Sequence, residues 1–330
     1  MLPQSAPCPM AHCAVMLALA RTSKATQMAR PTIAVFTKNK LNPAYHAARL
    51  GADRVAARMG AATVHYVPQQ PDNVDEQRAL IDAALAARPA AFVFVPVHGM
   101  HMDAAVRKIR AAGVPVFNLI NRLRNADDYV TFVGADDHQL ASRTGAFLYA
   151  AMGGRGNVVI LEGTPGTITS HERTRGFSDA ARNYPGIRIA GTRTGMFLYE
   201  EGKRAMQALL AEVPRIDGVA ATNDSMALGA LEALAAAGVT AKVVGVNAIP
   251  DAVGAIKAGR LLASADFDAL KISCLATEAA LRYLRGESVP KQILLPAQVV
   301  HQDNCAPWDR SIEERECPDW DSVVSRTALR

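Results

Sequence analysis

Short apolar runs alternate with alanine-rich helical patterns from Ile33 to Val300, and this alternation restricts the possible folds more than any other feature. The runs are continuously apolar, which is typical of strands buried on both faces. Strands joined by helices form parallel sheets covered by helices, so the sequence predicts an α/β fold. We predict strands at residues 33–36, 63–67, 91–97, 115–120, 129–134, 157–163, 187–192, 218–222, 242–246, 261–267 and 293–300.

The composition of the chain narrows the classes of function. Half of the 330 residues are hydrophobic and 20% are charged, which provides for a large core and a charged surface. The formal net charge is only +5 and the basic residues are scattered among acids, so we expect no nucleic acid partner. No apolar run reaches the ~18 residues that a membrane-spanning helix needs.

Two asparagines follow predicted strands in the second half of the chain. Asn223 follows the strand at 218–222, and Asn247 follows the strand at 242–246. Ligands bind at the carboxyl ends of strands in open parallel sheets, and amides both donate and accept hydrogen bonds. This chemistry suits a neutral polyhydroxylated ligand. Asp224 is predicted to cap the next helix, because its carboxylate can accept free N–H groups of the first turn.

The segments around these residues resemble one family. NDSMALGALEAL at 223–234, followed by VVGVNAIPDA at 243–252, is similar to the type I periplasmic sugar-binding proteins of the ribose-binding group. The sugar-sensing domains of LacI-type repressors are built in the same way. Further segments resemble the family in its own order. They are TIAVFTKNKLNPAY at 32–45, PVFNLINR at 115–122 and GTPGTITSHERTRGF at 163–177.

The resemblance implies the periplasmic binding protein type I fold, with two Rossmann-like lobes of parallel sheet joined by a three-strand hinge. Such a hinge lets one lobe bend on the other. The implied segments are a leader or misassigned start at 1–30, lobe one at 31–135 plus 268–296, lobe two at 136–267 plus 297–303, and a C-terminal tail at 304–330. We expect Trp308 and Trp320 to anchor this tail on a lobe.

The resemblance also implies a set of ligand-binding residues. Asn121 and Asn247 stand where the family usually has aspartate, and Phe267 stands where glutamine is frequent. For the arginines the alternative is a surface salt bridge, and for the phenylalanines it is the core. Lys38 is added because it shares a loop with Asn42. The expected ligand-binding residues are Lys38, Asn42, Tyr45, Asn121, Arg122, Arg173, Phe197, Asn223, Asn247 and Phe267.

The departures from the family pattern predict a cationic pocket. Asn121 and Asn247 lack the usual negative charge, whereas Arg122 and Arg173 remain. An uncompensated buried arginine is costly, and an anionic ligand would offset it. We therefore expect a sugar, a polyol or a sugar acid, with the acidic ligand favoured by this charge argument.

Other chemistry finds little support in the sequence. His98 and His101 lie three residues apart, but no third metal ligand is evident. The segment at 163–169 lacks the G-x-x-x-x-G-K of a phosphate loop, and no G-x-S-x-G motif is present. We predict no catalytic residues, no metal and no cofactor, and the chain is not expected to be an enzyme.

The ends of the chain carry the cysteines and the question of export. The apolar run at 13–20 could belong to a signal peptide whose removal leaves a mature N-terminus between residues 21 and 29, but residues 1–12 contain no Lys or Arg. Met28 is an alternative start. Cys305 and Cys317 could pair in an oxidising compartment or remain free thiols.

Three interpretations of function follow from these observations. The first is a periplasmic solute-binding protein that delivers its ligand to the permease of an ABC transporter and meets the membrane only there. The second is a cytoplasmic ligand sensor related to LacI-type repressors, without a DNA-binding headpiece. The third is an enzyme on an α/β scaffold, for which no nucleophile–base pair is evident.

Overall fold

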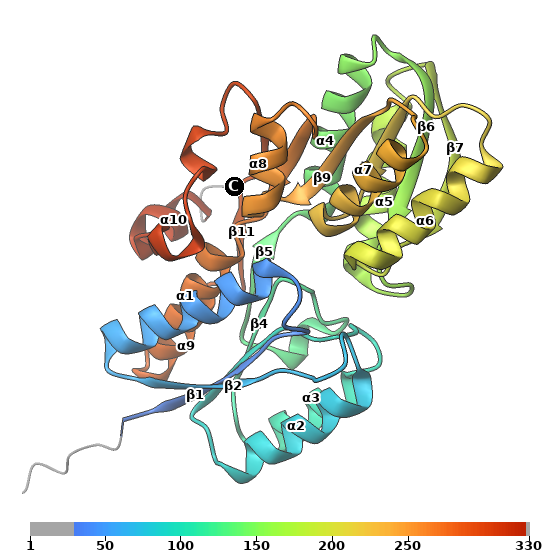
Figure 1. Cartoon of the computed structure of the whole chain (residues 1–330). Helices are drawn as coiled ribbons and strands as arrows, with labels where there is room; N and C mark the ends of the chain where they lie inside the picture. Colours follow the sequence, from blue (N-terminus) through green and yellow to red (C-terminus); the bar gives the residue numbers. More distant parts are fainter. Residues whose placement is uncertain (1–29, 328–330) are drawn as a thin grey trace, which may run out of the picture. The chain divides into compact units, whose positions relative to one another are not determined.

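The computed structural model describes residues 30–327, and these form two six-stranded sheets (Figure 1). The first sheet has the strand order β11-β5-β4-β3-β1-β2, and all its neighbouring pairs are parallel. Its strands are β1 (Thr32–Phe36), β2 (Ala62–Tyr66), β3 (Ala91–Phe94), β4 (Val116–Leu119), β5 (Thr131–Ala135) and β11 (Gln292–Leu295).

The second sheet has the order β12-β10-β9-β8-β6-β7, and only the pair of β12 with β10 is antiparallel. Its strands are β6 (Arg155–Glu162), β7 (Gly186–Thr194), β8 (Gly218–Ala221), β9 (Lys242–Asn247), β10 (Ala263–Asp266) and β12 (Gln298–His301). The chain passes between the sheets after β5, after β10 and between β11 and β12. The lobe boundaries given above stay a prediction.

Helices cover both faces of each sheet, as Figure 1 shows for α1 and α9 opposite α2 and α3. The helices are α1 (Pro43–Met59), α2 (Val74–Ala86), α3 (Asp103–Ala111), α4 (Asp137–Ala151), α5 (Ile168–Ala181), α6 (Tyr199–Glu212), α7 (Asp224–Ala236), α8 (Pro250–Lys257), α9 (Ala269–Leu284) and α10 (Trp320–Thr327). Short 3₁₀ turns are η1 (Ala126–Asp128), η2 (Ala306–Trp308) and η3 (Ile312–Glu314). Among residues 30–327, no helix has the length and apolar character needed to cross a membrane.

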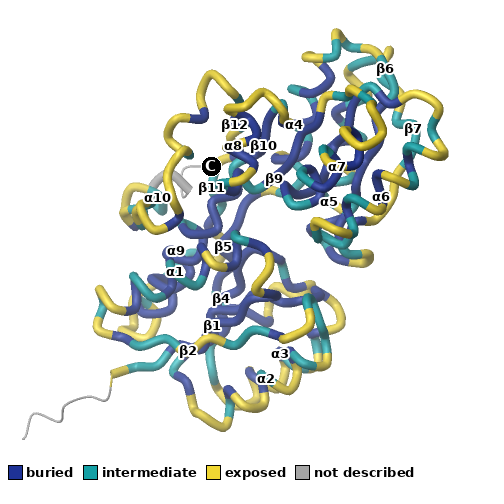
Figure 2. The backbone as a smooth tube through the Cα atoms, viewed as in Figure 1, coloured by how far each residue is buried: buried dark blue, intermediate teal, exposed yellow. Residues whose placement is uncertain are grey.

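The continuously apolar strands are explained by burial on both sides. In β1, Ile33 and Val35 belong to the core cluster under α1 and α9, whereas Ala34 and Phe36 belong to the cluster under α2 and α3. Successive side chains of a strand point to opposite faces, so both faces must be apolar. Figure 2 shows β1 as buried.

The structure corrects two of the strand predictions. The run at 293–300 is two strands in different sheets, because Pro296 has no N–H to donate and restricts the residue before it. The run at 63–67 was expected to be buried, but β2 lies at a sheet edge and the side chain of Val64 is 43% exposed.

The cysteines pair differently from the possibility considered above. Cys317 forms a disulfide with Cys274 of α9, with their Cα atoms 5.8 Å apart, and Cys305 is a buried free thiol. Cys305 packs in the core of the second sheet, whereas the chain around Cys317 lies along α9. The predicted signal segment lies outside the described residues.

Candidate functional site

The loops at the carboxyl ends of strands from both sheets meet around one buried polar cavity. Eight of the ten predicted residues line it, and only Lys38 and Arg122 are not among the lining residues. The full lining is Asn39, Asn42, Ala44, Tyr45, Asp72, Ile120, Asn121, Thr169, Arg173, Phe197, Asn223, Asn247 and Phe267.

The first-sheet wall begins at the end of β1. Asn42 caps α1, because its Oδ1 accepts the N–H of Ala44 at 3.0 Å, and Pro43 starts the helix. Tyr45, in the first turn of α1, donates its hydroxyl to Asn121 Oδ1 at 3.5 Å. Burial raises the pKa of Tyr45 well above its usual value, so the phenol stays a neutral donor.

A buried ion pair belongs to this wall, with Asp72 lining the cavity and Lys38 behind it. Lys38 is 1% exposed, and its Nζ is 3.3 Å from Asp72 Oδ2. Asn39 donates to Asp72 Oδ1 at 3.1 Å, and Thr164 from the loop after β6 donates to Oδ2 at 3.4 Å. The Lys38 ammonium also lies 5.7 Å from the ring centroid of Phe197, which follows β7. This pair therefore has contacts on both sides of the cavity.

The second-sheet wall contains a second buried ion pair. Arg173 of α5 is 3% exposed, and its Nε donates to Asp137 Oδ1 at 2.8 Å. Its NH1 group donates to the carbonyl of Thr222 at 2.8 Å and contacts Asn247 Oδ1 at 3.4 Å. The guanidinium carbon is 5.1 Å from the centroid of the Phe267 ring. Burial raises the pKa of Asp137, and the neighbouring Arg173 opposes that rise.

The strand ends at β8 and β9 differ in one respect from the prediction. Asn223, not Asp224, caps α7, because its Oδ1 accepts the N–H of Met226 at 3.0 Å. Asp224 is buried beneath the wall, and its carboxylate accepts from the Ser264 hydroxyl at 2.6 Å and the Ile249 N–H at 3.0 Å. A Cβ on Gly245 would lie 2.1 Å from this carboxylate. Strand β9 can therefore pass this close to Asp224 only because residue 245 is glycine.

The two asparagines also play structural roles here. Asn223 donates to the carbonyl of Phe197 at 2.9 Å and so holds the loop that carries this ring over the cavity. Asn247 has a φ of 126°, in the left-handed range that asparagine enters more readily than most residues. This backbone turns the Asn247 amide toward Arg173.

Arg122 lies elsewhere. Its guanidinium carbon is 4.0 Å from the centroid of the Phe132 ring in β5, and the side chain is half-buried there. A ligand contact for Arg122 stays a prediction, with nothing in the lining of the cavity to support it.

Sequence reasoning missed the two acids. Asp137 follows β5 by two residues, so the strand-end rule that found Asn223 could also have found it. Asp72 lies in the loop between β2 and α2, about six residues beyond the strand end, where that rule does not point, and it has a φ of 58°. With these acids, two cations beside the cavity face two carboxylates. The expectation of an uncompensated arginine is therefore wrong for Arg173, because Asp137 pairs with it.

The cavity is narrow. The centre of a water-sized sphere can occupy only ≈ 30 Å³ of it, which is room for about two waters. Asn121 from the first sheet donates to Thr169 of α5 at 2.8 Å across the gap. A larger hollow of ≈ 440 Å³ on the loop after β6 draws on the second sheet alone and includes none of the predicted residues.

The two histidines of the loop after β3 stack on each other, with ring centroids 3.9 Å apart. Nδ1 of His98 accepts the N–H groups of Met100 and His101, both at 3.3 Å. Burial lowers the pKa of His98, and electrostatic interaction with His101 and Lys38 lowers it further. In the part of the chain that the structure describes, no group of three His, Cys, Asp or Glu side chains could hold a metal ion.

Comparison with known proteins decides the family. The periplasmic binding protein domain model matches residues 33–288, most of the chain. The chain belongs to the periplasmic binding protein family. The chain is 30% identical to a D-apiose import binding protein of Paraburkholderia graminis over 87% of its length and 93% of that protein. It is 32% identical to a D-ribose/D-allose-binding protein of Pseudomonas aeruginosa over 66% of its length and 70% of that protein.

Solved structures of the family agree with this fold. An ABC transporter periplasmic solute-binding protein of Actinobacillus succinogenes, solved with bound D-allose, matches with a TM-score of 0.80 and 27% identity. It covers 84% of this chain and is itself covered fully. A solute-binding protein of Bacillus halodurans with bound myo-inositol matches with a TM-score of 0.79 and 25% identity, over 85% of this chain and 97% of its own.

Proposed function

We propose that the chain is the solute-binding protein of an ABC importer and that its cavity binds a small, neutral, polyhydroxylated molecule. One observation carries the ligand class: both buried cations beside the cavity already have a carboxylate partner. A ligand carboxylate placed there would add an unpaired buried charge, which is costly. This argument replaces the earlier preference for a sugar acid.

The lining has the groups that hydroxyls require. The phenol of Tyr45, the hydroxyl of Thr169 and the amides of Asn121 and Asn247 donate and accept hydrogen bonds. Phe197 and Phe267 add apolar ring surface that can pack on C–H groups. The relatives are named for apiose, ribose and allose, and the solved structures hold allose and myo-inositol, all neutral polyhydroxylated molecules.

Ligand entry requires motion of the walls. The present space holds about two waters, so a sugar can enter only if the first-sheet and second-sheet loops separate. The chain links the sheets by short crossings, which suits bending around them. We infer that the cavity opens and closes in this way during capture.

Calorimetry with matched ligands tests the ligand class. We expect a neutral aldose, or a polyol such as myo-inositol, to bind and to raise the melting temperature, and the corresponding uronic acid to bind at least tenfold more weakly. Arg173→Ala should weaken binding, whereas Arg215→Ala, which breaks an exposed ion pair with Asp217, should not. Tighter binding of the acid than of the neutral sugar would overturn the ligand class.

We also propose that the protein works in the periplasm and meets a permease there. The Cys274–Cys317 disulfide supports this location, because such bonds persist in oxidising compartments. The competing interpretation is the cytoplasmic ligand sensor, which would keep these thiols reduced. Thiol alkylation of the protein from fractionated cells distinguishes them. Two blocked cysteines in a periplasmic fraction are expected, and reduced thiols in the cytosol would contradict export.

A further inference from the structure

The segment from residue 304 to residue 320, here called the C-terminal clasp, follows β12 and has contacts at both sheets. It contains the turns η2 and η3 and ends where α10 begins. The family model ends before it, at residue 288. The sequence assigned it no role beyond tryptophan anchors.

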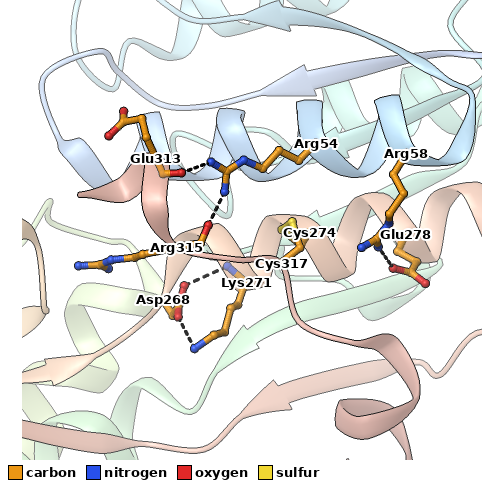
Figure 3. The surroundings of a disulfide bond; sticks show 9 residues. All are labelled: Arg54, Arg58, Asp268, Lys271, Cys274, Glu278, Glu313, Arg315 and Cys317. Carbon is orange, nitrogen blue, oxygen red and sulfur yellow. Dashed lines mark hydrogen bonds and ion pairs between the residues drawn. A yellow bond between two sulfur atoms is a disulfide. The ribbon is translucent and has the colours of Figure 1, made fainter. Parts of the chain in front are cut away.

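The later half of the clasp is fixed beside the first sheet. The disulfide joins Cys317 to Cys274 of α9, and Arg54 of α1 donates to the backbone carbonyls of Glu313 and Arg315, as Figure 3 shows. His46, also on α1, lies 3.0 Å from the Glu313 carboxylate. This end is therefore held covalently and by backbone acceptors.

Side-chain burial strengthens this anchor. Ile312 and Trp320 are buried in the same core cluster as residues of α1 and α9. The guanidinium of Arg282 from α9 lies 4.9 Å from the centroid of the Trp320 indole. Burial of large apolar side chains is stabilising, so this end does not detach without a large cost.

The earlier half of the clasp is attached beside the second sheet. Cys305 is buried in the core cluster of that sheet, and Trp308 packs against the same cluster. Burial raises the pKa of Asp266, the last residue of β10, and the Trp308 side chain opposes that rise. Asp309 forms an ion pair with Lys257 of α8, in which both side chains are about half exposed.

The clasp is thus a fourth passage of the chain between the sheets. Only residues 310–312 separate Asp309, which pairs with Lys257 of α8, from Glu313, which contacts α1. The disulfide, with a sequence separation of 43, closes a covalent ring that also contains the passage from β11 to β12. A crossing that is closed covalently has less freedom than a free chain end.

We propose that the C-terminal clasp is a covalently closed brace that restricts the bending of one sheet against the other. Hinge bending turns a few backbone dihedrals at each crossing. When the sheets bend against each other, the C-terminal clasp, which is attached beside both sheets, must also turn or stretch, or one of its ends must detach. The end at Trp308 and Asp309 releases first, because its ion pair is exposed and such pairs contribute little, whereas the other end is covalent. The clasp therefore narrows the range of inter-sheet distances in the ligand-free protein.

The test measures that range directly. Spin labels are placed at the exposed positions 86 on α2 and 211 on α6 through non-canonical amino acids, so that the native cysteines stay intact. Electron–electron resonance then gives the distance distribution without ligand. The Lys257→Ala/Trp308→Ala variant releases the second-sheet end, and we expect the distribution to widen on the order of twofold. Asp303→Ala, whose side chain is 93% exposed, is the matched control and should match wild type.

A second variant keeps the proposal testable if the first does not fold. Cys274→Ser/Cys317→Ser, or reduction of the wild-type disulfide, releases the covalent end instead, and the same widening is expected. A fall in melting temperature with an unchanged distance distribution would show that the clasp only stabilises the fold, and would overturn the brace. Because no ligand is used, this outcome is independent of the proposed solute.

Discussion

The two buried ion pairs beside the cavity resemble each other in burial but differ in what holds them. Arg173–Asp137 lies within the second-sheet wall, and every contact of Arg173 described above comes from that side. Lys38–Asp72 belongs to the first-sheet wall, yet Thr164 and Phe197 contact it from the other side. One pair is therefore a fixed part of a wall, and the other belongs to the contact between the walls.

This difference separates two tasks that a two-walled binding site must perform. A rigid wall requires a cation that cannot swing, and the bonds of Arg173 to Asp137 and the Thr222 carbonyl fix it in two directions. A contact that opens must break without leaving a buried charge unpaired. When Thr164 and Phe197 move away, Lys38 and Asp72 still neutralise each other. Substitutions should therefore affect the pairs unequally.

The largest effect is expected from Arg173→Met. This change leaves the Asp137 carboxylate buried without its cation, which should cost about 3–5 kcal/mol of unfolding free energy. The pKa of Asp137 should rise further, because the strongest interaction that opposes the effect of burial is then lost. Urea unfolding at pH 7 measures the loss. The Asp137→Asn/Arg173→Met double variant should recover part of it, and a double variant no more stable than the single would contradict the pairing.

The next effect concerns Asp224, which shares the second-sheet wall but bonds to a hydroxyl and an N–H rather than to a cation. Burial raises its pKa from 3.8 to about 6. The folded state therefore binds this proton more tightly than the unfolded state does. Its contribution is fully present below pH 4 and is lost as the pH rises through 6, about 2–3 kcal/mol in all.

The Asp224→Asn variant tests this pH dependence of the unfolding free energy, because an amide does not titrate. Unfolding free energies of wild type and variant, measured from pH 4 to pH 7, should converge or cross as the pH rises, since only wild type loses stability through this group. A constant difference across the range would show that Asp224 is already ionised at pH 4. The lack of a paired cation at Asp224 would then not explain how it differs from Asp137, which pairs with Arg173.

A smaller loss is expected from Lys38→Met. Asp72 keeps its hydrogen bonds from Asn39 and Thr164 and is 11% exposed, so it is left less isolated than Asp137. We expect about 2 kcal/mol, within the range for a buried polar group that loses one partner. The same urea experiment measures it. A loss equal to that of Arg173→Met would remove the distinction between the pairs.

Most of the fold could be predicted from the sequence, because strand and helix patterns depend on local burial. The division of residues 293–300 was missed, although Pro296 marks the break. A continuous apolar run states that both faces are buried but not in which sheet. The pairing of Cys317 with Cys274 was also missed, since it depends on the path of the clasp along α9.

For the site, the sequence predicted most of the lining residues but not the balance of charges. Strand-end residues such as Asn223 and Asn247 line the cavity as expected from topology. The charge balance was not predictable, because Asp72 lies far beyond the end of β2 in its loop and Asp137 pairs with Arg173 only through the packing of α4 on α5. A net charge counted from a few motif positions leaves out ion-pair partners from other segments, here Asp72 and Asp137.

The smallest effect tests the contact between the walls. Thr164→Val removes the hydroxyl that reaches Asp72 at 3.4 Å and should cost about 0.5–1 kcal/mol. A double-mutant cycle with Asp72→Asn isolates the pairwise energy from other effects of each change. If the first-sheet pair belongs to the contact between the walls, the coupling is favourable and Thr164→Val adds nothing in the Asp72→Asn background. Full additivity would place Asp72 on the first-sheet side alone, and the two pairs would then be equivalent.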